Sequence, residues 1–132
     1  MNRPINFAWP IVGTYLIIMA WMPYEGLLWL VMIVGILLTL LWGWMFFRQT
    51  PLLSGLGPVG RPAAFGALLG LVAPILILGL MILKTGVHAH GPEYSPLEIR
   101  WITQQIAIWP FVGSLAGFGI SFLGRSFANT SE

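Results

Sequence analysis

Cysteine and aspartate are absent from this chain of 132 residues, and charged residues of any kind make up only 8% of it. Without cysteine the chain forms no disulfide, has no thiol nucleophile and offers no thiolate ligand to a metal. Soluble domains carry about 25% charged residues. Because 58% of the residues are hydrophobic, polar groups cannot cover a globular surface, and lipid must be the solvent for most of it.

Further absences exclude whole classes of function. The basic residues stand singly along the chain, so we expect no nucleic-acid partner. No ionisable residue lies in the middle of an apolar segment, where ion and proton pathways usually need one. The glycine-rich stretch LSGLGPVGRP lacks the lysine of a phosphate-binding loop. These absences predict that the protein is not an enzyme, and we assign no catalytic residue.

Four apolar segments approach or exceed the length of about 20 residues that a helix needs to cross a bilayer. We expect spans at about residues 5–24, 26–47, 63–84 and 101–124. A tight turn at 23–26 makes the first two an antiparallel hairpin, and the Gly/Pro-rich linker 49–62 is predicted not to be helical. The sequence thus predicts a single domain, 1–132: an all-α integral membrane protein whose four transmembrane helices form an antiparallel up-down bundle.

The basic residues also predict the orientation, because arginine and lysine gather in cytoplasmic loops. One side of the membrane would carry Arg3, Arg48, Arg61 and Arg125, and the other would carry Lys84 and Arg100. The side with four basic residues is expected to be the cytoplasmic one, so both termini would lie on the cytoplasmic side of a bacterial inner membrane. The polar loop 84–100 would then face outwards.

Small residues in the last two spans predict where helices touch, because close helix contact in lipid requires small side chains. The third span contains Gly66 and Gly70, and the fourth contains Gly113 and Gly117, followed by Ser121. We expect these stripes to pack against each other within one chain, with Gly70 level with Gly117. A seam between two copies of the chain is the alternative.

The polar loop 84–100 contains both histidines, the only lysine and two of the four acidic residues. Its sequence Ser95-Pro96-Leu97-Glu98 is typical of a capping box and predicts a helix that begins near Pro96. His88 and His90 could together bind a metal, a haem or a chlorophyll-type pigment. They could equally be solvated loop residues, since structural metal sites usually gather about four ligands. We retain both as candidate cofactor ligands and assign no metal site.

Other polar side chains are candidates for contact with partner subunits. We expect Glu93 and Tyr94 in the loop, and Gln104 and Gln105 at the membrane entrance, to make such contacts. The bulky faces of the first two spans suit lipid, a chlorophyll-type pigment or a quinone. The tryptophans are explained by anchoring at the membrane boundaries.

Together these features predict a small non-catalytic accessory subunit of a larger membrane-embedded bioenergetic complex, either photosynthetic or in respiratory electron transport. Its partners would be other membrane protein subunits and the lipid bilayer. One alternative is a small oligomeric transporter or channel, with a water-filled path lined by Thr14, Tyr15, Thr39, Ser114 or Ser121. Another is a metal- or cofactor-handling membrane protein that uses His88 and His90.

Overall fold

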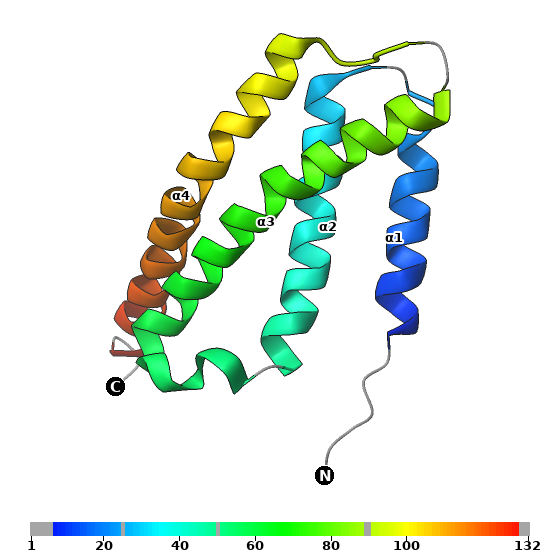
Figure 1. Ribbon diagram of the computed structural model, residues 1–132. Coiled ribbons are helices and arrows are strands. Elements are labelled where there is room, and N and C mark those ends of the chain that lie inside the picture. Colours follow the sequence, from blue (N-terminus) through cyan, green and yellow to red (C-terminus); the bar gives the residue numbers. More distant parts are fainter. Residues whose placement is uncertain (1–6, 25, 50, 89–90, 130–132) are drawn as a thin grey trace.

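The structure, a computed structural model, describes residues 7–24, 26–49, 51–88 and 91–129, and this part of the chain is helical. Its elements are α1 (Ala8–Trp21), α2 (Leu28–Gln49), the 3-10 helix η1 (Pro51–Leu56), α3 (Gly57–His88) and α4 (Pro96–Asn129). The α-helices run alternately up and down, as Figure 1 shows. We call the end where α1 begins and α4 ends the terminal end. The opposite end, where the two connections α1–α2 and α3–α4 lie, is the loop end.

Three of the helices, α2, α3 and α4, are long and apolar enough to cross a membrane. Helix α1 has only 14 residues, which is about 21 Å at 1.5 Å per residue, against about 30 Å for a bilayer core. The predicted first span, 5–24, is therefore longer than the helix within it. Part of that prediction, residues 5 and 6, lies outside the described residues.

The prediction that linker 49–62 is not helical is wrong. Residues 51–56 form η1, and α3 already begins at Gly57, with Pro62 inside it. Gly57 has a φ of +66°, which glycine adopts at little cost, and Pro58 follows at the start of the helix, where a missing N–H breaks no helical hydrogen bond. Pro62 then removes one bond in the second turn, and the 32-residue helix tolerates that loss.

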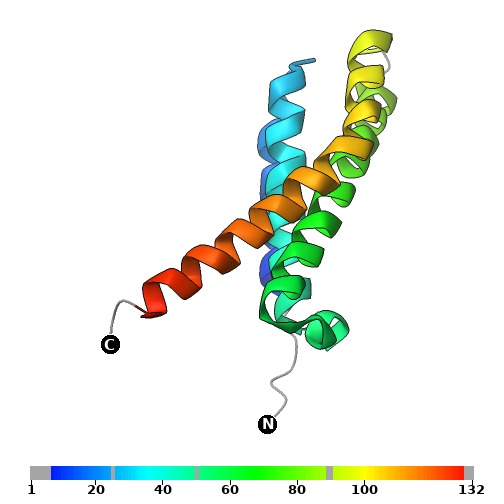
Figure 2. The same cartoon turned by 90° about the vertical axis from the view of Figure 1, so that its left-hand side faces the viewer.

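The helices form an open series, each packed on its neighbour in the sequence, rather than a closed bundle. Contacts join α1 to α2, α2 to α3 and α3 to α4, and among the described elements α3 with α4 is the closest pair. Figure 2 shows that α4 crosses α3 at an angle and that its last turns diverge from the other helices. One side of α4 is therefore open.

The buried core lies towards the loop end. It is made of large apolar side chains from the end of α1, the first half of α2, the second half of α3, the α3–α4 loop and the start of α4: Trp21, Val31, Val34, Leu38, Ile77, Leu80, Met81, Tyr94 and Ile102. No comparable cluster is found at the terminal end of the described helices. The molecule is therefore closed at one end and open at the other.

Helices α3 and α4 meet backbone to backbone along the glycine stripes. A Cβ atom built on Gly66 would overlap the carbonyl group of Gly113, and one on Gly117 would overlap the carbonyl group of Pro62. The expected register is wrong, because Gly70 faces Trp109 and not Gly117. Ser121 does not reach across; its hydroxyl donates to the Gly117 carbonyl in its own helix, at 2.8 Å.

The start of α4 confirms the predicted capping box. The Ser95 hydroxyl accepts a hydrogen bond from the Glu98 backbone N–H at 3.2 Å. In return the Glu98 carboxylate accepts from the Ser95 backbone N–H at 2.7 Å. This reciprocal pair satisfies two donors that the first turn of a helix leaves unpaired.

Candidate functional site

The only lysine of the chain is completely buried at the loop end. Lys84 lies on α3, and none of its side chain is exposed. Its ammonium group donates to the carbonyl oxygen of Tyr24 in the α1–α2 turn. It also lies 4.9 Å from the centre of the Trp21 ring and 3.5 Å from a carboxylate oxygen of Glu93. Because an unpaired buried charge is expensive, these contacts explain how an ammonium group is held inside an apolar core.

The Glu93 carboxylate joins three segments of the chain. Its Oε2 atom faces Lys84 and accepts a hydrogen bond from the Gly26 backbone N–H at 3.4 Å. Its Oε1 atom lies 3.1 Å from Nδ1 of His88. We call Trp21, Tyr24, Lys84, His88 and Glu93 the Lys84 cluster. It ties the α1–α2 turn and the α3–α4 loop to the end of α3.

Two of the residues predicted to contact a partner, Glu93 and Tyr94, are largely buried within the chain. The Glu93 side chain is only 12% exposed and Tyr94 is only 2% exposed, so both serve internal packing. Burial, and secondarily the negative charges of Glu93 and Glu98, raise the pKa of Tyr94 to about 12. The phenol therefore stays neutral at physiological pH. Its buried hydroxyl has no hydrogen-bond partner among the described residues.

His88 lies in the last turn of α3, and not in a loop as the sequence predicted. Its Nδ1 atom is close to two acceptors, the Lys84 carbonyl oxygen at 3.2 Å and Glu93 at 3.1 Å. Nδ1 therefore carries the proton, and Nε2 is the nitrogen that could ligate a metal or cofactor. His90 lies outside the described residues. No group of three or more potential metal ligands is found in the described part of the chain.

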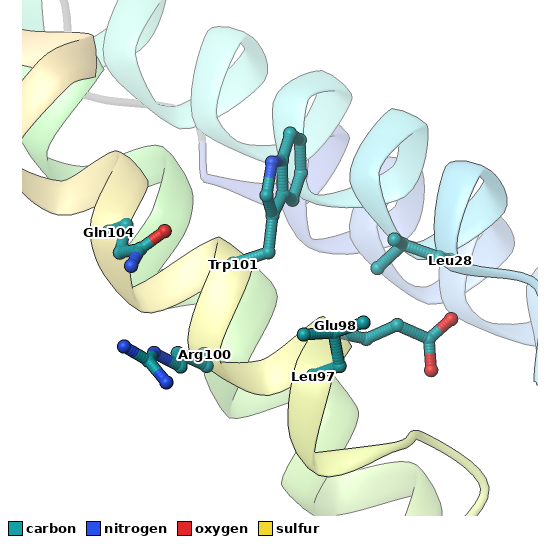
Figure 3. Close-up of a pocket in the computed structure, with 6 residues that line it drawn as sticks. All are labelled: Leu28, Leu97, Glu98, Arg100, Trp101 and Gln104. Carbon is teal, nitrogen blue, oxygen red and sulfur yellow. The ribbon is translucent and has the colours of Figure 1, made fainter.

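Gln104 and Gln105 occupy different faces of α4. The Gln105 side chain is used within its own helix: its oxygen accepts from the Trp109 indole N–H at 2.9 Å, and its nitrogen donates to the Trp101 carbonyl at 3.3 Å. Gln104 is exposed and borders a shallow hollow of about 540 Å³ between the starts of α2 and α4. Figure 3 shows Trp101 reaching from α4 towards α2 in this hollow. Only Gln104 of the pair faces outwards for a partner contact.

A larger apolar groove of about 840 Å³ opens between α2 and α4, over α3. Its walls and floor are mostly large apolar or small side chains: Ile36, Leu40, Trp44 and Phe47 from α2; Pro62, Phe65, Leu69 and Ala73 from α3; Ile108, Val112, Ala116 and Ile120 from α4. The glycines of the α3–α4 contact also border it. Most of these residues lie between the middle of the helices and the terminal end, where α4 diverges from α2.

Arg61 adjoins the terminal end of this groove, next to Pro62 and Phe47, which both line it. It is one helical turn before Phe65 on the same face of α3, and its guanidinium carbon is 4.5 Å from the centre of the Phe47 ring. One terminal nitrogen donates to the Phe47 carbonyl at 3.4 Å. The Nε atom is buried without a hydrogen-bond partner among the described residues, and an unpaired buried donor of this kind is rare in folded proteins.

The polar residues that the transporter alternative would place along a water-filled path lie on different helices. The Thr14 hydroxyl accepts from the Trp42 indole N–H at 2.9 Å, which links α1 to α2. The Thr39 hydroxyl donates to the Gly35 carbonyl of its own helix at 2.7 Å. Tyr15 is 59% exposed on the outside of α1. Within the single chain these groups make separate local hydrogen bonds or face outwards.

Sequence reasoning missed Lys84 and Arg61 as site residues. The sequence does contain a signal for them. Residues 62–83 carry no charge, so Arg61 and Lys84 mark the two ends of one apolar helical segment. They are 23 residues apart, about 35 Å at 1.5 Å per residue. This matches a bilayer core of about 30 Å crossed by a tilted helix. The sequence did not reveal that one cation is paired and the other is not.

The fold and these sites define an all-helical protein with three helices long and apolar enough to span a membrane, one charged cluster at the loop end and one apolar groove towards the terminal end. Comparison of the chain with protein-family models, with curated proteins and with solved structures gives no significant match.

Proposed function

We propose that this protein is a non-catalytic helical subunit of a larger complex in an energy-converting membrane, photosynthetic or respiratory, and that it packs against another membrane subunit through α4. The terminal end faces the cytoplasm of a bacterial cell, and α1, extended by the residues that flank it, completes a fourth crossing. We assign the complex to the energy-converting class because such complexes commonly include small, strongly apolar subunits.

The exposure of α4 carries this proposal. Only 6% of the residues in its most apolar stretch are buried within the chain, against 28% for each of α2 and α3. Phe111, Leu115 and Phe118 follow the spacing of one helix face and are 74%, 71% and 51% exposed. Because aromatic side chains are enriched in the buried centres of interfaces, we assign this stripe to a partner helix.

Charge supports the orientation. At the loop end Lys84 is buried against Glu93, so Arg100 is the one remaining basic residue there, beside Glu98. Towards the terminal end lie Arg48 at the end of α2, Arg61 near the start of α3 and Arg125 near the end of α4. The larger number of arginines at the terminal end favours the cytoplasm for that end.

Site-specific photocrosslinking in native membranes tests the proposal. A photoreactive phenylalanine analogue at Phe111 or Phe118 should give a crosslink to one distinct membrane protein, identified by mass spectrometry as a subunit of an energy-converting complex. The same analogue at Ile82, which is 74% exposed on α3, is the control for random encounters. Crosslinks from α4 only to other copies of this chain, with ion or solute flux in liposomes, would refute it in favour of an oligomeric transporter.

A further inference from the structure

We propose that the groove between α2 and α4 is a binding site for one anionic phospholipid of the leaflet at the terminal end, with its phosphate on Arg61 and its acyl chains in the groove. This inference rests on insertion in a membrane. It does not depend on the chain being part of a larger complex.

The dimensions of the groove fit a lipid. Along α3 it runs from Pro62 to Ala73, 11 residues apart in the sequence, which is about 16 Å at 1.5 Å per residue. This is about half of a bilayer core of about 30 Å, the depth of a single leaflet. A transmembrane helix of a partner would need contact across the whole core, but the packed cluster that includes Leu38, Ile77 and Leu80 closes the loop end.

The chemistry at the end of the groove fits a phosphate. The guanidinium of Arg61 is fixed by the Phe47 ring at 4.5 Å and by the Phe47 carbonyl at 3.4 Å, and its Nε donor is unused among the described residues. Arginine offers several donors in a planar fork that matches phosphate oxygens. A phosphate here would pair with the positive charge of the guanidinium, which no acidic side chain of the described residues neutralises.

The distribution of charge selects an anionic lipid over a zwitterionic one. Of the four acidic residues, Glu93 and Glu98 lie at the loop end, and Glu25 and Glu132 lie outside the described residues. Within the described part of the chain no ion pair involves Arg61. A basic pocket between membrane helices on the cytoplasmic side is the kind of site that binds anionic headgroups.

Native mass spectrometry of the purified, delipidated full chain tests the site, with phosphatidylglycerol and phosphatidylcholine of identical acyl chains as probes. Wild-type protein should bind one phosphatidylglycerol in preference to phosphatidylcholine. Arg61→Gln should weaken phosphatidylglycerol binding about tenfold, the effect expected for one charge-assisted hydrogen bond, and leave phosphatidylcholine unchanged. Arg61→Lys, which keeps the charge, should retain part of the preference.

Two further variants separate the headgroup from the tails. Ala116→Phe fills the α4 wall of the groove and should weaken the binding of both lipids. Arg100→Gln, at an exposed position on α4 near the loop end, is the matched charge control and should change neither. Equal binding of the two lipids by wild type, or an Arg61→Gln protein that keeps full phosphatidylglycerol binding, would overturn the proposal. Because the measurement uses the isolated chain, its failure would leave the proposed subunit function standing.

Discussion

Replacement of the two charged partners of the Lys84 cluster, singly and together, tests how the loop end is held. The variants are Lys84→Met, which keeps the length of the side chain without its charge, Glu93→Leu, and the double variant. We expect Glu93→Leu to be the more destabilising single change. It leaves an ammonium group that is 0% exposed with only a carbonyl oxygen and an aromatic face, whereas Lys84→Met leaves a carboxylate that is 12% exposed.

The expected magnitudes follow from this asymmetry. Loss of one partner from a buried ion pair costs about 3–5 kcal/mol, and Glu93→Leu should fall in this range. After Lys84→Met, Glu93 still accepts from the Gly26 N–H and still contacts His88. Lys84→Met should therefore cost about 1–3 kcal/mol, the range for a buried group that loses one hydrogen-bond partner. The double variant should be more stable than Glu93→Leu alone, because no unpaired ammonium group remains.

Equilibrium unfolding in mixed micelles, with increasing fractions of a denaturing detergent, gives the free energy of unfolding of each variant. Helix content measured by circular dichroism is the suitable signal, since fluorescence would also report the local change around Trp21. Thr103→Val, at an exposed position where the hydroxyl bonds only to its own helix, controls for the handling of variants. Equal costs for the two single variants, or a double variant whose cost is their sum, would refute the coupling that we derive from the cluster.

Two further predictions concern the helix contact and the buried tyrosine. Gly117→Ala should lower the thermal midpoint in detergent, because the added Cβ would overlap the Pro62 carbonyl group. The control Gly119→Ala, two residues along α4, places its Cβ in open space and should be neutral or stabilising by up to about 1 kcal/mol. Equal thermal midpoints for the two variants would contradict the α3–α4 contact. Burial raises the pKa of Tyr94 to about 12 in the folded chain, above the ordinary value that we expect in the unfolded chain. Unfolded protein therefore ionises first, and stability should fall by up to roughly 3 kcal/mol as the pH rises from about 10 to about 12. Tyr94→Phe should remove this pH-dependent loss in detergent unfolding; an identical loss in the variant would contradict the assignment.

The sequence predicted the elements of this fold better than their packing. Apolar runs located α2, α3 and α4, and the Ser95–Glu98 pair located the start of α4, because both signals are local. The register of α3 on α4 was missed because Gly70 was placed level with Gly117 on the assumption that the predicted spans 63–84 and 101–124 meet the same membrane surface at residues 63 and 124. In the structure Gly117 already faces Pro62, and α4 continues beyond that point to Asn129. Depth in a membrane cannot be read from apolar length when a helix projects beyond its neighbour.

The two cations of α3 explain why the candidate sites could not be ranked from the sequence. Lys84 and Arg61 look alike there, each closing one end of the same apolar segment. In the structure Lys84 has a carboxylate, a carbonyl oxygen and an aromatic ring around it, all supplied by segments distant in the sequence. Arg61 has an aromatic ring and one carbonyl oxygen, and its Nε donor lacks a partner within the described residues. A paired buried charge stabilises a fold, whereas a cation beside an open groove, with no acidic partner in the described residues, favours an anionic ligand. The terminal end, and not the polar loop that dominates the sequence, is therefore where ligand recognition is expected.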